Sequence, residues 1–141
     1  MRVMALDIGT VRVGVAISDP AMRVASPLCV LPSNEVRAHA KSCRNVLLDW
    51  EPELLVCGLP YTMQGEEGPQ ASFIREFAAE VERACNVPVE FTDERLSSSQ
   101  AKRSLREKGY SEKEMRGKID MIAASLFLQA WLDEQQVNSK G

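Results

Sequence analysis

Apolar residues near the start of the chain recur with the two-residue period that is typical of β-strands. Residues 2–7, 11–18 and 23–32 form three short apolar runs, and brief turns separate them. Successive strands joined by short turns predict an antiparallel meander. Pro27 in the third run favours an edge strand or a bulge, because proline has no backbone N–H to donate to a neighbouring strand.

Residues 33–50 change to the spacing of three and four residues that is typical of an amphipathic helix. Ser33 or Asn34 can cap this helix, and Pro52 closes it. We therefore predict one helix over these residues. Its apolar stripe comprises Val36, Ala40, Cys43, Leu47 and Trp50.

Residues 53–60 form a nearly continuous apolar run, which predicts a strand buried on both faces. A polar, glycine-containing loop over residues 61–70 follows, and Pro69 can begin a second helix. Residues 87–94 predict another short strand. The apolar stripe of the second helix comprises Phe73 or Ile74, Phe77, Val81 and Ala84.

The last third of the chain predicts two helices joined by a polar connector over residues 110–118. The first of these helices is capped by Ser97 or Ser98 and ends at Gly109. The second, over residues 119–132, is apolar nearly all round, so we expect it to pack against the sheet. Residues 135–141 are expected to fray.

The order of these elements predicts an α/β fold with a mixed five-stranded sheet. Three antiparallel strands come first and two parallel strands follow, with helices on both faces. A length of 141 residues suits one core, so we expect residues 1–141 to form a single domain.

Composition points to a cytoplasmic protein without a membrane segment. No apolar run reaches the roughly 20 residues that a membrane span needs, and the N-terminus lacks the pattern of a secretory signal. The four cysteines lack CxxC spacing, which favours reduced, buried thiols. His39 is the single histidine, so a zinc site is not expected.

Positive charge is concentrated in one segment of an acidic chain. The net charge is −3, whereas the segment from Arg95 to Lys118 has eight basic residues against three acidic ones. Such a stretch is either an electrostatic footprint for nucleic acid or a solvated helical face.

Three carboxylates stand at the ends of elements that are otherwise apolar. Asp7 ends the first strand, Glu94 follows the last strand, and Asp120 lies in the first turn of the apolar helix. Strand ends and helix starts can converge on one edge of such a sheet, where ligands bind. Clustered carboxylates are tolerated when a cation neutralises them. Oxygen ligands without histidine or thiolate favour Mg²⁺ or Mn²⁺, which can activate water for phosphodiester cleavage.

Each acid also has a simpler explanation. Asp7 can close a turn before Gly9, and Glu94 can pair with Arg95 at the surface. Asp120 can be a favourable charge at a helix N-terminus. Asp93 precedes Glu94 and should point to the opposite side of its strand, so we interpret it as structural.

Four segments resemble the signature blocks of the YqgF/RuvX family, in the RNase H-like superfamily. These are "LDIGTVRVGVAISD", "GLPYTMQGEEGPQA", "VPVEFTDERLSSSQA" and "KIDMIAASLFLQAWLD", and together they span nearly the whole chain in the family's order. The resemblance implies an RNase H-like fold and a metal-dependent nuclease whose acids are Asp7, Glu94 and Asp120. It also implies maturation of the 5′ end of 16S ribosomal RNA or resolution of Holliday junctions. Val11 departs from the family, which often has a basic residue there.

Several residues are candidates for substrate binding in this interpretation. Arg12 and Arg95 carry guanidinium groups that match phosphate oxygens, and Thr10 can contact a phosphate in the first turn. Lys118 can neutralise charge near the scissile phosphate. The basic stretch is expected to hold the nucleic-acid backbone through Lys102, Arg103 and Arg106.

Three alternatives remain open at this point. The motif around Asp7 also occurs in sugar kinases and actin-like ATPases, but those need two such domains. A four-way DNA junction would use the same acids, and a stable two-fold dimer would favour it, whereas a monomer or weak homodimer favours RNA processing. The protein can also be a binder of nucleic acid or ribosomal precursor particles that does not cut.

Overall fold

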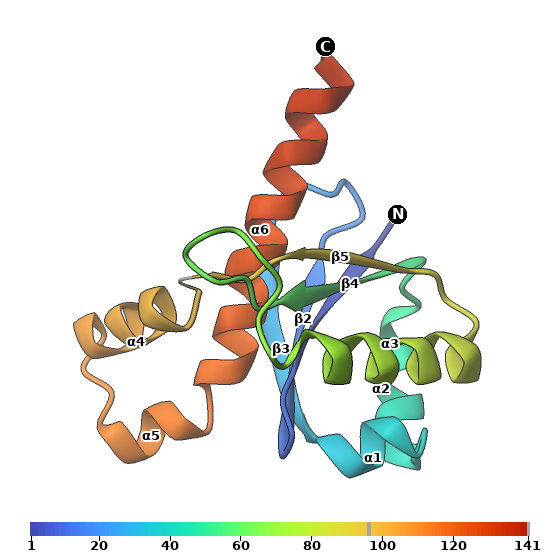
Figure 1. The fold of residues 1–141 in the computed structure, drawn as a ribbon, viewed down its shortest axis with the longest axis horizontal. Helices are drawn as coiled ribbons and strands as arrows, with labels where there is room; N and C mark the ends of the chain where they lie inside the picture. Colours follow the sequence, from blue (N-terminus) through green and yellow to red (C-terminus); the bar gives the residue numbers. More distant parts are fainter. Residues whose placement is uncertain (96, 141) are drawn as a thin grey trace.

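The computed structural model describes residues 1–95 and 97–140, and for residues 97–99 and 138–140 it describes the backbone alone. Five strands and six helices lie in this part of the chain (Figure 1). The strands are β1 (Val3–Ile8), β2 (Arg12–Ser18), β3 (Ala25–Pro32), β4 (Leu54–Leu59) and β5 (Val89–Asp93). The helices are α1 (Ser33–Arg37), α2 (Lys41–Trp50), α3 (Ala71–Cys85), α4 (Ser97–Glu107), α5 (Glu112–Arg116) and α6 (Ile119–Lys140).

The five strands form one mixed sheet in the order β3-β2-β1-β4-β5. β1 pairs antiparallel with β2, as β2 does with β3, whereas β4 pairs parallel with β1 and with β5. This arrangement confirms the predicted sheet. Pro27 lies on the edge strand β3, and the pairing with β2 shifts register between Val15 and Ala16, beside it. The proline therefore sits where the sequence predicts, at an edge and at an irregularity.

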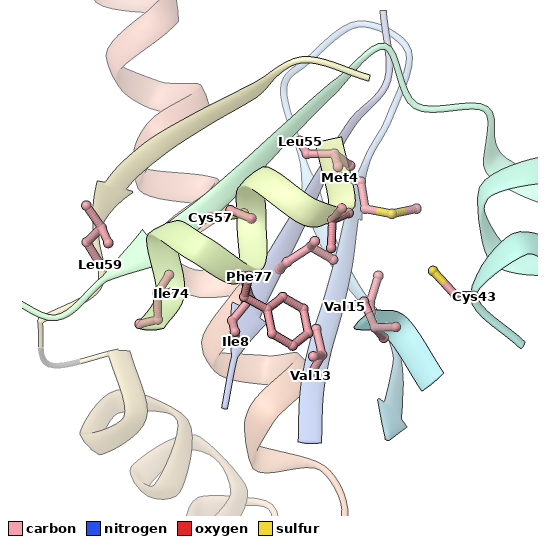
Figure 2. Packing of buried hydrophobic residues seen from close by; sticks show 14 of the residues in the cluster. Met4, Ile8, Val13, Val15, Cys43, Leu55, Cys57, Leu59, Ile74 and Phe77 are labelled. Carbon is pink, nitrogen blue, oxygen red and sulfur yellow. The ribbon is translucent and has the colours of Figure 1, made fainter. Parts of the chain in front are cut away.

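The two faces of the sheet carry different cores. Met4, Leu6 and Ile8 of β1 belong to the cluster under α1, α2 and α3, into which Ile74 and Phe77 of α3 pack (Figure 2). Val3 and Ala5 belong to the second cluster, under α6. Because successive side chains of a strand point to opposite faces, Asp7 lies on the α6 face. Figure 1 shows α4 and α5 beside α6, away from α1 to α3.

The prediction of one helix over residues 33–50 is wrong, because the chain forms two helices there. His39 has a φ of +52°, and Ala40 has extended backbone before α2 begins. Val36 and Cys43 are nevertheless buried on the same side of the sheet. Ser33 does not cap its helix, since its hydroxyl donates to the carbonyl of Gly9 at 2.7 Å.

Three further details differ from the sequence predictions. The polar connector contains α5, which Ser111 and Glu114 cap reciprocally and which buries Met115. α6 continues to Lys140, whereas the sequence predicts a helix that ends at residue 132. In α3 the buried stripe includes Ala78, whereas Ala84 is exposed.

Gly109 follows α4 with a φ of +86°, as expected for a helix-ending glycine. The side chains of Ser97 and Ser98, the predicted caps, lie outside the described residues. Among the described residues, none of the helices is long and apolar enough to cross a membrane.

Candidate active site

Glycines in two strands make room for the predicted acids on the α6 face. Gly14 of β2 pairs with Asp7 of β1. A Cβ atom at Gly14 would lie 2.1 Å from the carbonyl carbon and oxygen of Asp120. The start of α6 therefore rests directly on the backbone of β2, beside the strand position that carries Asp7.

Glu94 reaches the same place across β4. Its backbone N–H donates to the carbonyl of Leu59 at 3.2 Å, which continues the β4–β5 pairing by one residue. A Cβ atom at Gly58 would lie 2.8 Å from Oε2 of Glu94 and 2.9 Å from the ring of Phe127. Because Gly58 has no side chain, the carboxylate of Glu94 passes over β4 toward Asp7.

The carboxyl of Asp7 interacts with that of Glu94, and the charge of Asp120 acts on Asp7 as well. Burial, the charge and hydrogen bond of Glu94, and the charge of Asp120 raise the pKa of Asp7 to about 8. Burial also raises the pKa of Glu94. Two carboxyl groups can form a hydrogen bond when one of them keeps a proton. The pair therefore holds a proton near neutral pH, or a cation in its place.

This raised pKa predicts a pH-dependent stability. In the unfolded chain the carboxyl of Asp7 ionises near its ordinary value of 3.8, whereas in the folded protein it keeps its proton to about 8. Retention of this proton therefore stabilises the folded protein at acidic pH, and the contribution is lost as the pH rises through about 8. In EDTA we expect the free energy of unfolding to fall by about 1–3 kcal/mol between pH 5 and pH 8. Urea denaturation at both pH values measures this, and an Asp7→Asn variant with the same fall would contradict it.

Asp120 forms an ion pair with Arg12. Nε of Arg12 donates to Oδ2 of Asp120 at 2.9 Å. Among the described residues, no group of three or more histidine, cysteine, aspartate or glutamate side chains is spaced to hold a metal ion as it stands. The structure thus brings the three predicted acids to one edge of the sheet and pairs the third with an arginine.

Arg95 lies beside this cluster but is held by other groups. Its Nε donates to Oδ2 of Asp93 at 2.7 Å, and its Nη1 donates to the carbonyl of Thr62 at 3.1 Å. The guanidinium also lies 5.9 Å from the ring centre of Tyr61. Arg95 therefore fastens the loop after β4 to the end of β5, and Asp93 takes the structural role that the sequence predicts.

The other predicted binding residues lie in the first turn, before α6 and on α4. Thr10 is exposed in the turn between β1 and β2. Nζ of Lys118 lies 5.1 Å from the ring centre of Tyr110, just before α6. The basic face of α4, comprising Lys102, Arg103 and Arg106, borders a hollow of about 330 Å³ with Glu107.

The sequence analysis did not single out Gly14, Gly58 or the pairing of Arg12 with Asp120. Glycine inside a strand signals a close approach of another group, so the two glycines carried a usable signal. The ion pair joins residues 108 positions apart in the sequence, and only the fold brings them together.

The strand order and the acid-bearing edge define an α/β protein of the RNase H-like fold. Thermus thermophilus RuvC in complex with a Holliday junction superposes with a TM-score of 0.56 at 14% identity, covering 97% of this chain and 96% of that chain. Fowlpox virus resolvase in complex with Holliday junction DNA also gives 0.56, at 17% identity, covering 96% and 99%. These likenesses support the fold alone.

The chain belongs to the RuvX family, described as Holliday junction resolvase, whose model matches residues 1–134. A relative from Anaeromyxobacter sp. (strain Fw109-5), named "Putative pre-16S rRNA nuclease", is 45% identical over 133 residues, which cover 94% of this chain and 97% of the relative. A relative of the same name from Roseiflexus sp. (strain RS-1) is 39% identical over 135 residues, which cover 96% of each chain.

Proposed function

We propose that this protein is a metal-dependent nuclease that hydrolyses phosphodiester bonds in precursor 16S ribosomal RNA, at the 5′ end, and that residues 1–141 form one nuclease domain. The observation that carries the proposal is the meeting of three carboxylates at one edge of the sheet. Gly14 pairs with Asp7 and lies against the backbone of Asp120, and Gly58 lies against the carboxylate of Glu94. The names of the relatives support the substrate. Four free cysteines agree with the reducing cytoplasm as its location.

The donor chemistry of the cluster fits a hard divalent cation. Asp7 and Glu94 offer carboxylate oxygens in a partly buried place, and burial raises both pKa values, so a cation can replace the shared proton. Asp120 would be the third ligand, once the cation replaces Arg12 as its partner. Mg²⁺ or Mn²⁺ bound there would supply Lewis-acid chemistry, activating water and offsetting charge on the leaving oxygen.

The chain's own residues have separate tasks in the reaction. Asp7 and Glu94 lie on a rigid sheet. They give up their shared proton and keep the site at this edge of the sheet in a fixed position. Water adds its oxygen to phosphorus and gives up one proton, and the bond from phosphorus to the leaving sugar oxygen breaks. The leaving oxygen takes up one proton in turn, so the reaction consumes one water molecule. Thr10, Arg12, Arg95 and Lys118 are proposed to contact phosphate, with Arg95 acting from its place between Asp93 and the loop after β4.

The basic face of α4 is proposed to bind the nucleic-acid backbone. Its three side chains are exposed, and Arg106 lies 3.6 Å from the carboxylate of Glu112. We expect the triple variant Lys102→Ala, Arg103→Ala, Arg106→Ala to weaken RNA binding about 10- to 100-fold in dilute salt. The dependence of log K on log salt should become shallower by about 2 to 3, because fewer counterions are released. Fluorescence anisotropy at several salt concentrations measures both. An unchanged slope would show that the nucleic acid binds another surface of the protein.

A second candidate is cleavage of four-way DNA junctions. The family description favours it. It would use the same acids and would need two active sites related by two-fold symmetry. We propose a monomer or weak homodimer, which agrees better with RNA processing on ribosomal precursor particles.

One assay separates these candidates from a protein that binds without cutting. The purified protein is incubated with labelled precursor ribosomal RNA and with a synthetic four-way junction, each with Mn²⁺, Mg²⁺ or EDTA. Metal-dependent cleavage of the RNA alone supports the proposed function. Symmetric cleavage of the junction alone replaces it with the second candidate. Binding of both without cleavage would overturn the nuclease proposal.

A further inference from the structure

Arg12 lies near both the exposed turn between β1 and β2 and a carboxylate of the acid cluster. It is the first residue of β2, next to the exposed turn that holds Thr10, and its side chain is 50% exposed. Nε donates to Oδ2 of Asp120, whose side chain is 24% exposed. Among ion pairs between described residues, this one alone includes a carboxylate of the acid cluster.

The three acids of the cluster differ in their charged partners. Among the described residues, Asp7 and Glu94 form no ion pair. Asp120 is balanced by the guanidinium of Arg12. A divalent cation at Asp120 would therefore repel the guanidinium of Arg12 across the same carboxylate and favour its release. The released guanidinium would stand at the edge of the site, half exposed to solvent.

A phosphate is the group that fits the released guanidinium. The planar fork of arginine matches two phosphate oxygens, and the exposed position beside Thr10 lies where a nucleic-acid strand would approach the acids. Arg95 differs in this respect, because Asp93 and the carbonyl of Thr62 hold it, and neither is a member of the acid cluster.

We propose that Arg12 is a positioning residue that exchanges between Asp120 and a phosphate of the nucleic acid, so that cation binding and nucleic-acid binding favour each other. The inference rests on the proposed function, since it takes the three acids as cation ligands. Without cation, Arg12 neutralises Asp120. With cation and nucleic acid together, Asp120 faces the cation and Arg12 faces the phosphate. Each ligand then lowers the free-energy cost of the exchange for the other, and the coupling is reciprocal.

The test measures binding and not cleavage. Mn²⁺ is titrated calorimetrically into the wild type and into Arg12→Gln, each alone and with a phosphorothioate RNA oligonucleotide that resists hydrolysis. In the wild type we expect the RNA to raise Mn²⁺ affinity about tenfold, within the usual range of such couplings. In Arg12→Gln we expect tighter Mn²⁺ binding without RNA, because the competitor is gone, and a gain from RNA below about twofold.

Two further variants make the result specific. Arg23→Gln removes an exposed positive charge from the turn between β2 and β3 and should behave as the wild type. Arg12→Lys keeps the charge beside Asp120 but lacks the fork, so it should bind Mn²⁺ alone as the wild type does and gain less from RNA. It also covers the case in which Arg12→Gln does not fold.

The outcomes separate the two proposals. If the wild type does not bind Mn²⁺, or if Asp7→Asn binds it equally well, the proposed metal site fails whatever Arg12 does. If Mn²⁺ binding depends on Asp7, while the gain from RNA persists in Arg12→Gln and Arg12→Lys, the metal site stands and the exchange is overturned.

Discussion

Replacement of Asp7 by asparagine is expected to lower the rate of phosphodiester cleavage by about a thousandfold or more. Asp7 lies at the centre of the acid cluster, where its carboxyl interacts with that of Glu94 and with the charge of Asp120. In the proposed site, loss of this carboxylate would remove one of the three anionic ligands of the cation. A thousandfold loss is about 4 kcal/mol, which is in the range of what a catalytic cation contributes.

The same variant should fold at least as well as the wild type when no metal is present. Asparagine keeps the shape of a protonated aspartate and does not need to lose a proton at neutral pH. A loss of activity with retained stability therefore separates catalysis from folding. Asp49→Asn is a matched control, because this aspartate is exposed on α2, which packs against the other face of the sheet. An Asp7→Asn variant that cleaves precursor RNA at the wild-type rate would refute the assignment.

Replacement of Gly14 by alanine is expected to have the largest effect on stability. The added Cβ would lie 2.1 Å from backbone atoms of Asp120 and 2.6 Å from the backbone nitrogen of Met121. These are backbone atoms of α6, so the helix itself must move away from the sheet. We expect a loss of about 2–4 kcal/mol in the free energy of unfolding, at the upper end of overpacking effects.

The variant should also lose activity beyond its loss of stability, because Asp120 moves with the helix and away from Asp7. Urea denaturation and cleavage assays at a temperature where the variant is folded separate the two effects. Gly117→Ala is the control, since a Cβ there meets its nearest atom at 3.9 Å and the backbone is already helical. Unchanged stability and activity in Gly14→Ala would contradict the close packing of α6 on β2.

The sequence predicted the sheet well because its signals are local. Period-two runs and short turns specify the meander, and the fully buried run of β4 marks a central strand. The break between α1 and α2 escaped prediction because Val36 and Cys43 keep a helical spacing across it. α5 was not predicted because its sequence is short and polar. Met115 is its one buried residue, so it has no apolar stripe with helical spacing.

Part of the candidate site could also be predicted from local features of the sequence. Carboxylates at strand ends and at a helix start predicted a shared edge, and the structure places Asp7, Glu94 and Asp120 there. Their roles as ligands remain predictions. The hydrogen bond from Arg12 to Asp120 and the contacts across Gly14 and Gly58 depend on which elements pack together, and no local pattern contains that information.

Anomalous diffraction from crystals grown with Mn²⁺ would locate the cation without relying on a choice of substrate. We expect an anomalous peak within coordination distance of the carboxylates of Asp7, Glu94 and Asp120, with Arg12 turned away from Asp120. We also expect this peak to be lost in Asp7→Asn. A peak elsewhere, or an Asp7–Glu94 hydrogen bond that persists in saturating Mn²⁺, would contradict a metal centre built from these three acids.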